Sequence, residues 1–213
     1  MMTRRTYYSA TQLRYHNHLP VIGDLIGGKR SSTLTVGVIG LGNIGSAFAL
    51  RAKALGMRVI FHDPYIRRGG HKSLGLDHRC ESLQELLEQS DVVSIHCNLT
   101  GETRRMINRQ TIQWMKSPGS YLINTARGAI VEEEALVEAL EQGNLAGAAL
   151  DVLEREPYTD GHLQNVKNLI VTSHCAFYSD QSFSELRRKA AEEMKRMLTG
   201  QKPWYIINTN DKM

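Results

Sequence analysis

The hydrophobic positions of this 213-residue chain alternate between two periods along its length. Short runs rich in Val, Ile and Leu are each followed by a longer stretch whose apolar positions recur at helical spacing. We predict six strands, at residues 35–39, 57–61, 91–95, 120–124, 145–150 and 168–172. We predict four helices between them, at residues 46–55, 82–88, 108–115 and 131–141. This alternation over short connections indicates a doubly wound parallel sheet with flanking helices, an α/β fold.

The two ends of the chain do not follow this alternation. Residues 3–17 have a loose helical pattern, and Pro and Gly interrupt any regular element in residues 16–32. Residues 182–198 carry apolar side chains at helical spacing among Glu, Arg and Lys. We therefore predict an N-terminal helix and connector at 1–33, an α/β domain at 34–178, and a C-terminal helix and tail at 179–213.

The first predicted strand runs into a glycine-rich turn, Gly40-Leu41-Gly42-Asn43-Ile44-Gly45. In a dinucleotide site the first glycine permits a tight turn, the second lets the backbone approach a pyrophosphate, and the third lets the helix pack on the strand. Free N–H groups at the start of the helix then face the phosphates. Three glycines alone are weak evidence, but the strand before them and the helical pattern after them predict a Rossmann-type NAD-binding domain.

An acidic residue, Asp63, stands at the end of the second predicted strand. It follows Gly45 by roughly the 20 residues at which a carboxylate accepts hydrogen bonds from the adenosine ribose and repels the 2′-phosphate of NADP. The alternative is an acidic turn residue before Pro64, which the order of strand, turn, helix, strand and acid makes the weaker interpretation. We predict NAD as the cofactor, although Arg67 or Arg68 could relax that preference.

The composition narrows the classes of function. The chain is 41% hydrophobic and 23% charged, with a net charge of +4, which is typical of a folded domain. Basic residues are interspersed with acids, so we expect no direct nucleic-acid binding. Cys80, Cys97 and Cys175 have no paired spacing, which suits a reducing compartment and predicts no metal site. With no apolar stretch long enough for a signal core or a membrane span, we expect an intracellular protein.

Three chemically different side chains follow three different predicted strands. Arg127 follows the fourth strand, Glu156 the fifth and His174 the sixth. The carboxyl ends of parallel strands meet at one edge of the sheet, so we expect these side chains to face the cofactor crevice. Arg anchors a carboxylate and polarises a keto group, His exchanges a hydroxyl proton, and Glu orients the imidazole. Singly each residue is more readily structural, but together they predict a hydride-transfer site.

These motifs resemble the D-isomer-specific 2-hydroxyacid dehydrogenase family. The resemblance rests on the glycine turn, Asp63–Tyr65, His96–Thr100, Asn124–Gly128, Asp151–Pro157 and His174. Within the family, Arg4–Thr6, Arg51–Gly56 and His174–Ser182 look most like the C-terminal-binding proteins, which are NAD(H)-sensing transcriptional corepressors of the nucleus and cytoplasm, and their dehydrogenase relatives. The resemblance implies an NAD-dependent oxidoreductase acting on the CH–OH group of 2-hydroxy acids or on 2-keto acids, with a corepressor role as a second implication.

The resemblance also implies roles for individual residues. The implied catalytic residues are Arg127, Glu156 and His174. The implied cofactor contacts are Gly40, Leu41, Gly42, Asn43, Ile44, Gly45, Asp63, Cys97, Asn98, Leu99, Thr100, Thr103, Thr125, Ala126, Arg127, Asp151, His174 and Phe177. The chain departs from the family pattern at Ser173, where Pro is usual, and at Phe177, where the corepressors have Trp.

Family members carry a longer segment before the glycine-rich strand, forming most of a substrate domain, whereas 34 residues precede Thr35 here. We therefore expect an N-terminally truncated member with weak or no turnover by itself. Two alternatives stay open: a non-catalytic NAD-binding module that acts through dimerisation, or a remnant with no independent role. The apolar stripe of residues 182–198 predicts association with a second copy or another family member, and transcription factors are further expected partners.

Overall fold

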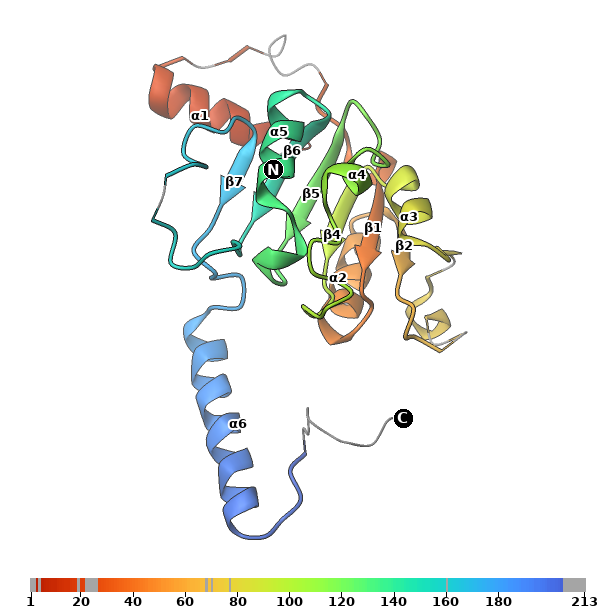
Figure 1. Ribbon diagram of the computed structural model, residues 1–213, viewed down its shortest axis with the longest axis vertical. Helices are drawn as coiled ribbons and strands as arrows, with labels where there is room; N and C mark the ends of the chain where they lie inside the picture. The colour runs from red at the N-terminus through yellow and green to blue at the C-terminus, as the bar shows by residue number, and fades with distance from the viewer. Residues whose placement is uncertain are drawn as a thin grey trace. The chain divides into compact units, whose positions relative to one another are not determined.

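The computed structural model describes residues 3, 5–18, 20–21, 27–67, 69, 71–76, 78–159 and 161–204. The chain divides into two compact units, Met1–His174 and Cys175–Met213. The first unit contains a sheet with its helices, and the second contains one long helix (Figure 1). Among the described helices, none combines the length and the apolar character that crossing a lipid bilayer requires.

Within the described residues, seven strands form one parallel sheet in the order β3-β2-β1-β4-β5-β6-β7 (Figure 1). They are β1 Thr35–Ile39, β2 Arg58–His62, β3 His78–Arg79, β4 Val92–Ile95, β5 Ser120–Asn124, β6 Leu145–Leu150 and β7 Leu169–Val171. The predicted fold class and all six predicted strands are confirmed. Strand β3 was not predicted, because two residues carry no periodicity. The strand order reverses between β1 and β4, which is the switch point where such sheets bind ligands.

The helices are α1 Thr6–His16, α2 Asn43–Ala54, α3 Leu83–Gln89, α4 Arg109–Ile112, α5 Glu133–Glu141 and α6 Asp180–Leu198, and the 3-10 turns are η3 Ser31–Thr33, η4 Lys72–Leu74 and η5 Gly128–Ile130. Side-chain caps start several of them: the Ser82 hydroxyl accepts the N–H of Glu85 at α3, for example. Three predicted helix boundaries were wrong. Helix α2 begins at Asn43, three residues before the predicted start. Helix α4 is shorter than predicted and ends at Ile112, and α5 begins at Glu133 because η5 precedes it.

Strand side chains alternate between two hydrophobic cores. Val38 and Phe61 pack on the face of the sheet that α2 covers. Ile60 and Leu122 pack on the opposite face, together with α3, α4 and α5. Helix α5 lies against β6 on that face (Figure 1). Strand β1 is buried at all five positions, which accounts for its uninterrupted apolar run and places its carboxyl end inside the domain.

The segments outside the sheet have fewer buried side chains. Helix α1 buries none of its residues, and the carbonyl of Thr3 accepts the N–H of Lys29 at 2.7 Å. The predicted connector lies partly outside the described residues, as does the tail after Trp204. In the second unit, the guanidinium carbon of Arg196 lies 4.3 Å from the centre of the Trp204 ring.

Candidate active site

The glycine turn between β1 and α2 leaves room for a ligand. Gly40 adopts φ +86°, and a Cβ there would lie 2.8 Å from the backbone nitrogen of Cys97. A Cβ at Gly45 would lie 2.0 Å from the carbonyl oxygen of Gly40. Gly42 is the N-cap residue of α2, and no side chain caps the N–H groups at this end of the helix. A Cβ at Gly42 would meet no atom within 4 Å. The protein's own packing thus requires two of the glycines, while Gly42 faces the open space that a pyrophosphate occupies in dinucleotide sites.

Asp63 stands at the mouth of this turn. Its Oδ2 accepts the N–H of Leu41 at 2.8 Å, and its Oδ1 accepts the N–H of Tyr65 at 2.9 Å. These bonds fix the carboxylate, and each oxygen keeps a further lone pair for a ribose hydroxyl. Arg67 is exposed, and Arg68 lies outside the described residues. The turn and its acid therefore fit NAD in shape and in hydrogen-bonding capacity.

His96 and Cys97, at the start of the loop after β4, provide an uncharged wall for the turn. Burial lowers the pKa of His96 to about 4, so its imidazole is neutral at physiological pH. The His96 Nε2 lies 2.9 Å from the Ser94 hydroxyl, and its ring centre lies 4.8 Å from that of Phe48. Burial also raises the pKa of the Cys97 thiol to about 11. This wall adds no charge that would oppose an anionic pyrophosphate.

The loop after β5 is shaped by the fully buried Asn124. Its Oδ1 accepts the N–H of Ala126 at 3.0 Å, and its Nδ2 donates to the carbonyl of Arg127 at 2.9 Å. One residue further on, a Cβ at Gly128 would lie 1.9 Å from the carbonyl carbon of Leu153. The loop that carries Arg127 therefore lies directly on the loop after β6.

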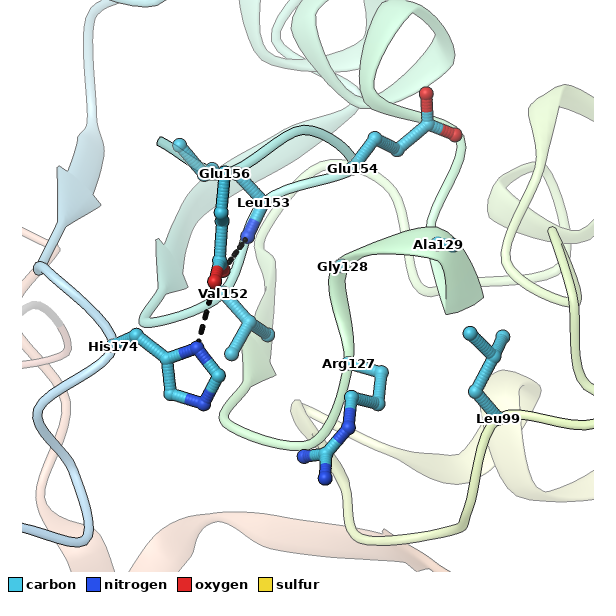
Figure 2. A pocket seen from close by; sticks show the side chains of 9 residues that line it. All are labelled: Leu99, Arg127, Gly128, Ala129, Val152, Leu153, Glu154, Glu156 and His174. Carbon is cyan, nitrogen blue, oxygen red and sulfur yellow. Dashed lines mark hydrogen bonds and ion pairs between the residues drawn. The ribbon is translucent and has the colours of Figure 1, made fainter. Parts of the chain in front are cut away.

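Glu156 and His174 contact each other across these loops. Glu156 Oε2 lies 2.7 Å from His174 Nδ1, and Glu156 Oε1 accepts the N–H of Leu153 at 2.9 Å (Figure 2). The hydrogen bond with His174, helped by the Leu153 N–H, holds the pKa of the Glu156 carboxyl below its usual range. Because the ionised carboxylate can only accept, Nδ1 of His174 carries the proton. The Nε2 atom is then the one that exchanges a proton with a ligand.

Arg127, Glu156 and His174 line one cavity of about 240 Å³ (Figure 2). The complete lining is Leu99, Arg127, Gly128, Ala129, Val152, Leu153, Glu154, Glu156 and His174. Arg127 Nη1 donates to the carbonyl of Ala126 at 2.6 Å, which holds the guanidinium at the rim. A guanidinium and an imidazole that face the same small, partly apolar space suit an anionic ligand with a carbonyl or hydroxyl group.

The structure places most of the predicted site residues at the carboxyl edge of the sheet. The predicted cofactor residues lie in the glycine turn and in the loops after β2, β4, β5, β6 and β7.

Thr103 orders the loop after β4, since its hydroxyl donates to the carbonyl of Asn98 at 2.6 Å and accepts the N–H of Thr100 at 2.8 Å. Asp151 is buried and accepts the hydroxyl of Thr172 at 2.5 Å. Phe177 belongs to the second unit and is 52% exposed. The roles of all these residues in binding or catalysis stay predictions.

Glu133 is the residue of this region that the sequence did not single out. Along the chain it is one of three consecutive glutamates that complement the dipole of α5. In the structure it is only 7% exposed, and its Oε1 accepts the backbone N–H of Glu154. Its Oε2 lies 3.2 Å from His162 Nε2. No local pattern separates Glu133 from the exposed Glu134, because the contact spans 21 residues.

One group of described residues brings three metal-ligating atoms within 4.8 Å of one another: His78, Cys80 and Glu85. Glu85 already accepts the N–H of Glu81 at 2.8 Å and lies 3.2 Å from His78 Nε2. Burial raises the pKa of Cys80 to about 12, so its thiol stays protonated at neutral pH. We assign no metal to this group.

Comparison with known proteins identifies the family of this chain. A family model described as the NAD binding domain of D-isomer specific 2-hydroxyacid dehydrogenases matches residues 1–176. The chain is 36% identical over 218 residues to C-terminal-binding protein 1 of Caenorhabditis elegans, which covers 98% of this chain. It is 41% identical over 175 residues to glyoxylate reductase of Aeropyrum pernix, which covers 82% of this chain.

A solved structure shares the same architecture. D-lactate dehydrogenase of Aquifex aeolicus, complexed with NAD and lactic acid, matches with a TM-score of 0.80 and 33% sequence identity over 93% of this chain. The present chain spans 63% of that protein's length. It spans 29% of the length of the Caenorhabditis elegans relative and 51% of that of the Aeropyrum pernix relative.

Proposed function

We propose, from the premise that this chain belongs to the D-isomer specific 2-hydroxyacid dehydrogenase family as its NAD-binding domain, that it carries the catalytic groups for redox chemistry on 2-hydroxy and 2-keto acids. The observation that carries the proposal is the 2.7 Å contact of Glu156 with His174, at a cavity that Arg127 also lines. The names of two relatives, a glyoxylate reductase and a D-lactate dehydrogenase, refer to acids of this class.

Each of the three side chains has a distinct role in the proposed reaction. NAD(H), when bound, supplies the hydride acceptor or donor. The forked guanidinium of Arg127 hydrogen-bonds the substrate carboxylate and polarises the neighbouring carbonyl. His174 Nε2 donates a proton to the keto oxygen during reduction and accepts it back during oxidation. The Glu156 carboxylate accepts a hydrogen bond from the Nδ1 proton and so fixes the tautomer and the orientation of the His174 ring.

Turnover measurements test this proposal. We expect NADH consumption with glyoxylate or pyruvate to be slow in this chain by itself and to fall by about 10²–10⁴-fold in His174→Ala, the usual contribution of positioned acid–base catalysis. If the parent rate is too low for its ratio to the variant rate to be measured, binding of oxamate to the NADH-loaded chain is the second readout. Arg127→Met should abolish that binding, and Arg127→Lys, which keeps the charge without the fork, should weaken it. A His174→Ala variant that matches the parent rate would contradict the acid–base role.

We propose an interaction module as the second candidate function. The similarity to the Caenorhabditis elegans C-terminal-binding protein extends over 98% of this chain, and α6 carries Leu186, Met194 and Met197 at 57–64% exposure. Exposed apolar side chains on one helix favour association with a second copy or another family member. A corepressor role, with transcription factors as partners, would require such an assembling surface.

Light scattering at micromolar concentration tests the interaction module. We expect the unsubstituted chain to self-associate and both Leu186→Glu and Met194→Glu to be monomeric, because a charge on the stripe opposes burial. Lys195→Glu, elsewhere on α6, controls for the added negative charge. A monomeric parent chain that both stripe substitutions leave unchanged would remove the physical basis for this function.

A further inference from the structure

Two of the loops that line the candidate active site, those that carry Arg127 and Glu156, meet at one buried carboxylate, that of Glu133. Helix α5, which carries Glu133 in its first turn, begins shortly after η5 and so continues the loop that carries Arg127. Glu133 Oε1 accepts the backbone N–H of Glu154, in the loop that carries Glu156. The Glu133 side chain is 8% exposed, so this bond is shielded from competing water.

Two consecutive N–H groups of the Glu156 loop point to two different glutamates. The N–H of Leu153 donates to Glu156 Oε1 at 2.9 Å, and the N–H of Glu154 donates to Glu133. The first bond occupies one oxygen of Glu156 and leaves the other, Oε2, 2.7 Å from His174 Nδ1. The direction of the Glu156 carboxylate therefore depends on where the backbone of residues 153–154 is held.

The Glu133 carboxylate is itself held on both sides. Its Oε2 lies 3.2 Å from His162 Nε2, and the His162 ring centre lies 5.6 Å from that of Tyr158. The Tyr158 hydroxyl accepts the N–H of Leu163 at 2.7 Å, which closes this loop on itself. A carboxylate with both oxygens engaged cannot rotate freely, so it gives the Glu154 N–H a fixed acceptor.

We propose that Glu133 is a positioning residue for the Glu156–His174 pair. It anchors the backbone of residues 153–154, and that backbone aims the Glu156 carboxylate at His174 Nδ1. The catalytic meaning of this arrangement rests on the proposed function. The arrangement itself needs neither a cofactor nor a substrate, so it can be measured separately.

The test is a carbon-13 NMR titration of the Glu156 side-chain carboxyl in the full chain. The pKa of this carboxyl is held below its usual range, chiefly by His174. A His174→Gln variant provides the benchmark for Glu156 without an imidazole partner. We expect Glu133→Ala to raise the pKa of Glu156 toward that benchmark, because the released backbone no longer aims the carboxylate.

Matched variants separate positioning from a general loss of structure. Glu134→Ala removes the same charge from the same turn of α5, but Glu134 is exposed, so the Glu156 titration should not change. Glu133→Gln keeps an oxygen for the Glu154 N–H and should preserve the parent pKa of Glu156. If Glu133→Ala does not fold, Glu133→Asp replaces it, since it keeps the charge but is too short to reach the same N–H.

Two results would overturn the proposal. One is a folded Glu133→Ala or Glu133→Asp variant in which Glu156 titrates as in the parent chain. The other is a Glu133→Gln variant that behaves like Glu133→Ala, because the hydrogen bond to Glu154 would then not be the cause. Neither result depends on turnover, so failure of this proposal is distinguishable from failure of the proposed function.

Discussion

The cofactor turn and the catalytic loops of this domain are held by different physical means. In the turn, backbone atoms of neighbouring residues decide the shape, since Gly45 packs on the carbonyl of Gly40 five residues earlier. In the catalytic loops, side chains and backbone groups join distant segments, as Glu133 does with Glu154 across 21 residues. At Gly40 and Gly45 the first arrangement leaves no room for an added Cβ, whereas the second depends on hydrogen bonds that a substitution removes one at a time.

This difference predicts how each region responds to change. Backbone atoms cannot move aside easily, so a methyl group at Gly40 or Gly45 should affect folding and binding together. Hydrogen bonds between exposed or half-exposed groups contribute modestly and depend on pH. The expected effects below therefore decrease from the turn toward the catalytic loops.

Gly45→Ala should have the largest effect. The alanine Cβ would lie 2.0 Å from the Gly40 carbonyl oxygen. Because that oxygen belongs to the backbone, the contact can be relieved only if a backbone segment moves. We expect the free energy of unfolding to fall by about 1–3 kcal/mol or more and NAD binding to become undetectable. Denaturant unfolding and calorimetric titration measure both quantities. Normal stability with normal binding would show that this contact does not limit the turn.

Gly42→Ala separates binding from folding in the same turn. A Cβ at Gly42 would meet no protein atom within 4 Å, so we expect the free energy of unfolding to be unchanged. The methyl group would occupy the space next to the pyrophosphate and should weaken NAD binding roughly 10–100-fold, about 1.4–2.7 kcal/mol. Unchanged NAD affinity in this variant would show that the pyrophosphate does not bind next to Gly42.

Asp63→Ala should have a smaller effect on affinity and a larger one on selectivity. The substitution removes the acceptor for ribose hydroxyls, which should cost about 1 kcal/mol of NAD binding, and it removes the charge that repels a 2′-phosphate. Asp63→Asn is the matched control, because it keeps an acceptor oxygen without the charge. Competition between NADH and NADPH, followed by fluorescence, measures both variants. Undiminished preference for NADH in Asp63→Asn would exclude charge repulsion as its source.

The smallest expected effect belongs to Glu156 and depends on pH. Its pKa is lowered in the folded state, chiefly by His174, so its ionised form stabilises the fold above the unfolded-state pKa of about 4.3. That contribution is lost as the pH falls through the lowered folded-state pKa. We expect the parent chain to exceed Glu156→Gln in stability at pH 7 and this difference to shrink as the pH falls below about 4.3. Denaturation curves across this range give the difference directly, and a constant difference would exclude the linkage.

Much of the fold could be predicted because the physical causes act over few residues. The unbroken burial of β1, the alternating burial of β5 and the helical spacing of α5 each leave a recognisable pattern in the sequence. Gly40 and Gly45 are required by backbone contacts within the turn and with the adjacent loop. Because the carboxyl ends of parallel strands share one edge, the order of the chain is enough to predict that Arg127, Glu156 and His174 lie together.

The tertiary structure alone decided how these residues are held. Strand β3 is too short to show a period, and Gly128 is required only because the loop after β6 lies against it. Glu133 and its neighbour Glu134 are the same residue type in the same stretch of sequence, yet of these two only Glu133 is buried against the loop that carries Glu156. The reason is physical: periodic burial is local, whereas a steric contact or a hydrogen bond between loops exists only after β5, β6 and β7 have paired in register.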